Sequence, residues 1–149
     1  MRTGSSHWLD VRDKPAFLHR LMTELAGNAR ISLEGDLSKC QFADEVVVGR
    51  KEIGILKSAT LSPELDFCVL KLNPETIKTI FDQIGVSGLN DDIIHVQIEK
   101  AEVLELGAYD NFHSDCVVTG PGVSKVLLDE LVQRKVIRNY RLAVLNSQK

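Results

Sequence analysis

The chain has 149 residues, which is enough for one domain with a hydrophobic core. Hydrophobic residues make up 44% and charged residues 26% of the chain, a composition that is typical of a globular protein and excludes wholesale disorder. The formal net charge of −3 disfavours nucleic acid as a partner, because a phosphate backbone attracts basic surfaces.

The sequence also carries signals about the compartment. No apolar run approaches the roughly 18 residues of a membrane-spanning helix. The first residues lack the apolar segment of a secretory signal. The three cysteines are widely spaced, which fits a reducing compartment better than a disulfide framework. We therefore expect a cytoplasmic protein that makes no membrane contact.

The first part of the chain divides into a leader and the start of a domain. Residues 1–12 are predicted to be a flexible leader, and residues 13–149 a single domain. A helix is predicted over 14–26, because Asp13 offers an N-cap and Pro15 suits the first turn.

The middle of the chain alternates strands with a second helix. Asn73 and Pro74 favour a helix start, and Gly85 favours its end. Short apolar or alternating runs predict strands over 29–34, 42–48, 53–57 and 66–72. The strands over 42–48 and 53–57 are expected to form a hairpin.

A further hairpin is predicted between residues 93 and 109. Strict alternation from Ile94 to Glu99 indicates a half-buried strand, and 103–109 returns as its partner. We expect the polar face of this hairpin to be exposed; it carries His95, Gln97, Glu99 and Glu105.

The last part of the chain predicts a helix from Val123 to Val132 and a strand over 136–145. Strands outnumber helices and often adjoin each other in sequence. This order indicates an α+β fold, with a mainly antiparallel sheet of about five to six strands and three helices packed largely on one face.

Reactive and aromatic side chains gather after the second hairpin, and we predict a binding surface there. It consists of Tyr109, Asp110, Phe112, His113 and the nearby His95. In a purely structural interpretation, Tyr109 and Phe112 anchor the strand end, Asp110 and Asn111 form a turn, and Cys116 is a small hydrophobe.

Two chemical alternatives use the same segment. In one, Cys116 is a nucleophile, His113 its base, and Asp110 or Asp115 orients the imidazole. In the other, His113 and Cys116 begin a zinc site completed by His95 or Cys68. Paired ligands at finger-like spacing are missing from the sequence, so we expect neither a metal nor another cofactor.

Two other features have weaker functional interpretations. A set of carboxylates could act as acid–base pairs or hold Mg²⁺, although charged strand ends and loops explain them equally; the set is Glu34, Asp36, Asp44, Glu45, Asp91 and Asp92. The Gly120-Pro121-Gly122 run precedes a helix and could bind an anion, but it matches no phosphate-loop motif.

The segment VSKVLLDELVQRKVIRNYRL, residues 123–142, carries a local basic bias. It is similar to the recognition helix and wing strand of winged helix-turn-helix regulators, a resemblance of about twenty residues that implies DNA binding. The preceding NFHSDCVVTG departs from that family, because it cannot supply the first helix of the motif.

Three classes of function remain. A non-enzymatic binding module, such as an inhibitor, an immunity-type protein or an adaptor, needs only a shaped polar and aromatic surface, and this class fits best. A small hydrolase-like enzyme using His113 and Cys116 is the alternative, and a nucleic-acid binder ranks third. The expected partner is another protein, and a homodimer is compatible with the sequence.

Overall fold

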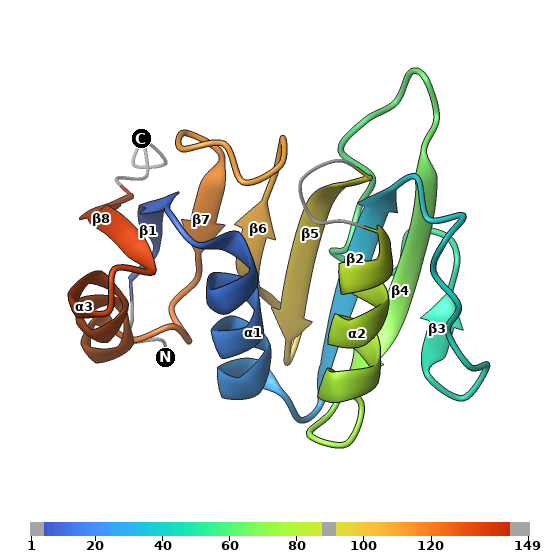
Figure 1. Ribbon diagram of the computed structural model, residues 1–149, viewed down its shortest axis with the longest axis horizontal. Helices are drawn as coiled ribbons and strands as arrows, with labels where there is room; N and C mark the ends of the chain where they lie inside the picture. The colour runs from blue at the N-terminus through green and yellow to red at the C-terminus, as the bar shows by residue number, and fades with distance from the viewer. Residues whose placement is uncertain (1–4, 88–91, 144–149) are drawn as a thin grey trace.

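The computed structural model describes residues 5–87 and 92–143. Within them, the chain forms an α+β fold with one antiparallel sheet of eight strands and three helices (Figure 1). The strand order is β3-β4-β2-β5-β6-β7-β1-β8. Their bounds are β1 (His7–Val11), β2 (Ala29–Gly35), β3 (Val47–Gly49), β4 (Asp66–Leu72), β5 (Ile93–Lys100), β6 (Val103–Ala108), β7 (Val117–Thr119) and β8 (Ile137–Leu142).

Helices cover one face of the sheet. In Figure 1, α1 (Lys14–Leu25) and α2 (Ile77–Ser87) lie side by side in front of the strands, and α3 (Lys125–Gln133) lies beside β8. The buried leucines of α3 belong to the same hydrophobic cluster as the buried side of α1. Alternate strand residues complete this core, because every second side chain points to the helical face; they include Ile31, Leu33, Leu70, Val96 and Ile98.

Local sequence explains where α1 begins and what holds its end. Asp13 is the N-cap, and its side chain accepts a hydrogen bond from the Ala16 backbone N–H at 3.1 Å. At the other end, Lys100 Nζ donates to the carbonyls of Leu25, at 3.0 Å, and Gly27, at 2.7 Å. A cation at a helix C-terminus satisfies free carbonyls and complements the helix dipole.

A segment without regular structure crosses the other face. Residues 50–65, called here the 50–65 segment, follow β3, form hydrogen bonds to side chains of β2 and β5, and then lead into β4. Leu56 from this segment and Val69 of β4 are fully buried, yet neither belongs to the main core cluster. The sheet is therefore covered on both faces over β2, β4 and β5.

The fold class is as predicted, but the sheet is larger than five to six strands. Residues 7–11 of the expected leader form β1, because its buried Leu9 completes the core between β7 and β8. Residues 117–119, for which the sequence predicted no strand, form β7. The hairpin expected over 42–57 is reduced to β3 and an isolated bridge between Ile53 and Leu56.

Candidate functional site

The polar face of β5 is buried, so the expectation that it is exposed is wrong. His95, Gln97, Glu99 and Glu105 are between 3% and 5% exposed. The register pairs His95 with Glu34 and Gln97 with Ser32 of β2, which places these polar side chains on the far side from the helices. Buried polar groups need hydrogen-bond partners. The 50–65 segment provides one each for His95 and Gln97, whereas Glu99 bonds to Arg30 and the Glu102 N–H, and Glu105 accepts from the Gly122 N–H.

Glu34 is the main anchor of the 50–65 segment. One carboxylate oxygen accepts from Ser58 Oγ at 2.6 Å and from the Thr60 backbone N–H at 3.1 Å, and the other accepts from the Ala59 N–H at 2.8 Å. Gln97 Nε2 donates to the Lys57 carbonyl at 2.6 Å. Hydrogen bonds to a buried carboxylate are stronger than neutral ones, so they hold the segment against the sheet.

His95 joins the 50–65 segment to the loop after β6. Its Nδ1 accepts from the Asp110 backbone N–H at 3.2 Å, and its Nε2 lies 2.7 Å from Thr60 Oγ1. In the neutral imidazole, Nδ1 is therefore the acceptor and Nε2 carries the proton that Thr60 accepts. Because this tautomer donates to Thr60, His95 does not act as a base toward that hydroxyl; it positions two loops.

The loop after β6, residues 109–116, is called here the 109–116 loop. Asp110, Asn111 and Phe112 have φ values of 53°, 58° and 63°. The left-handed region is unusual for three successive residues without glycine, and for a bulky side chain above all. Phe112 is 3% exposed and packs edge-on against Phe17 of α1, with ring centroids 6.1 Å apart.

The structure divides the predicted binding residues into two groups. Phe112 and His95 are buried, so they support the loop rather than contact a partner. Tyr109 is half-buried, with its ring tilted against His95 at 5.7 Å, and burial beside Glu34 raises its pKa. Solvent reaches the tip of the loop, which consists of Asp110, His113, Ser114 and Asp115.

The alternative catalytic set is not arranged for nucleophilic attack. Cys116 Sγ lies 3.7 Å from Asp110 Oδ2, to which it donates, and the Nδ1 of His113 accepts from the Asp115 backbone N–H at 3.3 Å. Burial, followed by the negative charge of Asp110, raises the pKa of the Cys116 thiol. A thiol nucleophile needs the opposite, a pKa lowered by a cation or a base.

Two of the carboxylates noted in the sequence, Asp36 and Asp92, and the glycine run have polar partners. Asp36 Oδ1 accepts from the Ser38 N–H at 3.1 Å, Asp92 lies 3.5 Å from Lys39 Nζ, and Asp91 lies outside the described residues. The Gly122 N–H donates to Glu105 Oε1 at 2.8 Å, so the glycine run wraps a buried carboxylate. Over residues 5–87 and 92–143, no three His, Cys, Asp or Glu side chains gather as a metal site would require.

The segment similar to a winged helix-turn-helix has the expected helix and strand, α3 and β8. The residues before it form a turn and β7, so the first helix of that motif is not present in this described stretch. Among the described residues, no helix is long and apolar enough to cross a membrane.

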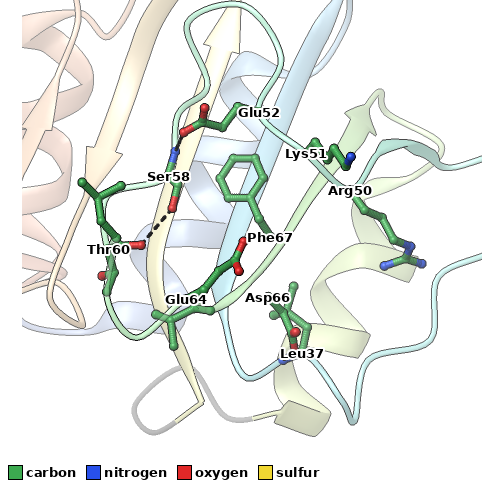
Figure 2. A pocket seen from close by; sticks show the side chains of 11 residues that line it. Leu37, Arg50, Lys51, Glu52, Ser58, Thr60, Glu64, Asp66 and Phe67 are labelled. Carbon is green, nitrogen blue, oxygen red and sulfur yellow. Dashed lines mark hydrogen bonds between the residues drawn. The ribbon is translucent and has the colours of Figure 1, made fainter.

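A hollow of about 790 Å³ lies beside the 50–65 segment. Figure 2 shows the Phe67 ring near its centre, Arg50 and Lys51 on one side, and Ser58 with Thr60 on the other. Ser58 Oγ is committed to Glu34, so it is held as a structural donor. Sequence reasoning considered Glu34 only as a possible acid–base or Mg²⁺ carboxylate, and it did not identify Ser58 as the partner of Glu34.

The chain was compared with models of protein families, with curated proteins and with solved structures. No family model matches it, and neither a curated protein nor a solved structure does.

Proposed function

We propose that this protein is a non-enzymatic protein-binding module and that the exposed tip of the 109–116 loop is its contact surface. The observation that carries the proposal is the run of three left-handed residues, Asp110 to Phe112. Residues in sparsely populated backbone regions cost roughly 1–3 kcal/mol each and persist only where the surroundings impose them. Such strain concentrates at functional sites.

The surroundings that impose this conformation are visible on both sides of the loop. Phe112 is fixed in the core against Phe17, and the Asp110 N–H is fixed by His95. The Asn111 N–H donates to the Ile94 carbonyl at 2.9 Å, which ties the middle of the loop to β5. A loop held in one conformation loses little entropy on binding, which favours affinity.

The chemistry of the tip indicates the partner. Asp110, His113 and Asp115 present two carboxylates and an imidazole on an exposed turn. Carboxylates on a rim steer association with a basic surface, and their contribution falls as salt rises. We therefore infer a partner protein with a basic patch. The free thiols of Cys68 and Cys116 are typical of a protein in a reducing compartment such as the cytoplasm.

Site-specific photo-cross-linking tests this proposal. A photoreactive amino acid replaces His113 in the full chain, and the control places it at Lys78, whose side chain is 87% exposed on α2. A discrete protein that cross-links at 113 and not at 78 would support a binding role for the loop. An identical set of products at both positions, or none at 113, would contradict it.

A double variant tests whether the captured protein binds through the tip of the loop. The Asp115→Asn and His113→Ala changes together leave the buried supports in place, so the fold is expected to persist. Interface residues that matter cost more than about 1 kcal/mol when truncated. We expect the double variant to bind the captured protein about tenfold more weakly, whereas Lys78→Ala should bind like the wild type.

A further inference from the structure

The two edges of the sheet differ in length. β3 is an edge of three residues with an irregular register against β4, which offers little room for another strand. β8 forms the other edge with six residues and pairs only with β1 among the described strands. A long edge is a template for an added strand unless something blunts it.

Backbone geometry identifies the groups at the open side of β8. The Ala143 N–H donates to the Ser6 carbonyl at 2.9 Å, and the register continues with Trp8 opposite Arg141 and Leu9 opposite Tyr140. In an antiparallel pair, every second residue directs its N–H and C=O to the partner and the others direct theirs away. The N–H and C=O groups of Tyr140 and Leu142 therefore point away from β1.

Charged side chains do not close this edge. The Arg138 guanidinium turns back over β1, donating to Asp10 Oδ1 at 3.0 Å and to the Val11 carbonyl at 3.3 Å. The Tyr140 hydroxyl is bound by Asp129 of α3. Leu142 is 57% exposed, although it is a large apolar residue.

Two hollows lie where α3 meets β8, and both are lined by Tyr140. One, of about 650 Å³, is lined on its apolar side by Pro121, Val123 and Leu142. The other, of about 460 Å³, is lined by Val132 and Asn139. Strand addition obtains affinity from backbone hydrogen bonds and specificity from pockets that accept alternate side chains. The β8 edge offers both.

The charge around the larger hollow indicates which side chains an added strand would need. Lys125 and Arg141 line the larger hollow, and neither forms an ion pair within the described part of the chain. A second copy paired through β8 with Tyr140 opposite Tyr140 would place another IRNYRL strand, with two arginines and no carboxylate, beside the first, and it would leave Lys125 and Arg141 without an acidic partner from that strand. An extended segment with carboxylates would supply one.

We propose that the open edge of β8 binds an extended acidic segment of another protein as an added strand. Its backbone pairs with Tyr140 and Leu142, alternate side chains enter the two hollows, and a carboxylate lies beside Lys125 and Arg141. This surface shares no residue with the 109–116 loop, so either proposal can fail without the other.

A pair of synthetic peptides tests the proposal. One alternates Glu and Val, and its matched control alternates Lys and Val; both are labelled for fluorescence anisotropy and titrated into the full chain. We expect the Glu peptide to bind and to slow amide hydrogen exchange at Tyr140 and Leu142, with the Lys peptide at least about tenfold weaker. Equal binding of both peptides, or no slowing at these amides, would overturn it.

Variants of the edge separate backbone pairing from side-chain contact. Leu142→Pro removes an outward N–H, and Leu142→Ala keeps that N–H while removing the same side chain. The proline variant should lose the Glu peptide and the alanine variant should retain it, and identical affinities would contradict strand addition. Arg141→Glu keeps all backbone groups and should reverse the peptide preference, which keeps the proposal testable if Leu142→Pro does not fold.

Self-association is the remaining outcome. Sedimentation of the chain without peptide should show a monomer. A dimer that Leu142→Pro abolishes would assign the edge to a second copy and overturn the acidic partner. The double variant of the 109–116 loop should bind the Glu peptide like the wild type.

Discussion

At the scale of single residues, two side chains of the 109–116 loop look like a catalytic pair in the sequence but do not contact each other as one in the structure. His113 and Cys116 are close in sequence and chemically suited to each other. In the folded chain, Cys116 donates to Asp110 and His113 accepts from Asp115. Neighbouring reactive residues on a tight turn direct their side chains according to the local backbone, so proximity in sequence does not make a catalytic pair.

The pKa of Cys116 gives a prediction at this scale. Burial and the Asp110 carboxylate raise that pKa, so the thiolate forms only at a higher pH than in a free cysteine. Alkylation of Cys116 by iodoacetamide at pH 8 should be slower than that of a free thiol. Asp110→Asn removes the negative charge and should accelerate it several-fold, as measured by mass spectrometry of the peptide containing Cys116.

Cys68 serves as the internal control in the same experiment. It is fully buried and its pKa is also raised, first by desolvation, so its alkylation should stay slow in both proteins. Wild-type Cys116 reacting faster than a free thiol at pH 8 would contradict this account and favour the nucleophile alternative.

At the scale of elements, the unexpected feature is the 50–65 segment on the far face of the sheet. It converts a polar strand face into an interior, with Glu34 as the acceptor for three donors from residues 58–60. The segment contributes Leu56 as its buried apolar anchor. Because Leu56 is the one fully buried apolar side chain of the 50–65 segment, the attachment of the segment to the sheet depends on the network of hydrogen bonds to Glu34.

The network predicts what happens when its charge is removed. Glu34→Gln keeps the volume but loses hydrogen bonds to a charged acceptor, each worth roughly 1.5–3 kcal/mol. We expect amide exchange at residues 58–60 to become at least about tenfold faster, while exchange in α1 changes little. Asp36→Asn, which neutralises an exposed carboxylate nearby, is the matched control; equal acceleration in both variants would contradict the role of Glu34.

The helices and strands also show which features of the fold can be predicted from local sequence patterns. The pattern over 66–72 predicts β4 with its observed bounds, and Asp13 caps α1 as expected, because alternation and capping are local properties. The polar face of β5 looked exposed because its covering segment comes from residues 50–65, about forty positions earlier. Nothing local to β5 encodes that cover. The residue types of the 109–116 loop can be read from the sequence. The burial of Phe112 depends on Phe17, and that of His95 on the 50–65 segment, and both of these lie far away in the sequence.

At the scale of the whole molecule, one hydrophobic cluster connects every helix with the central strands. Phe112 belongs to that cluster, although it lies on a loop. A domain of this size with a continuous core is expected to unfold in one cooperative step.

Phe112→Ala tests this cooperativity. Truncating a buried phenylalanine costs about 3–5 kcal/mol, and we expect the free energy of unfolding in urea to fall by that amount. Trp8, the single tryptophan, reports on β1 by fluorescence, and far-UV circular dichroism reports on the whole chain. The two transitions should shift together. A shift in only one of them would show that the end of the sheet around β1 unfolds separately.

The place of β1 has a consequence for how the chain is made. Residues 7–11 lie between β7 and β8, so His7 is paired with Leu142, which is 135 residues later (142 − 7). At roughly 5–20 residues per second, a ribosome needs about 7–27 seconds to make that stretch. Until β7 is made, the first strand has no lateral neighbour, and its apolar side chains are open to chaperones. The nascent chain completes its sheet only when the last strand emerges from the exit tunnel.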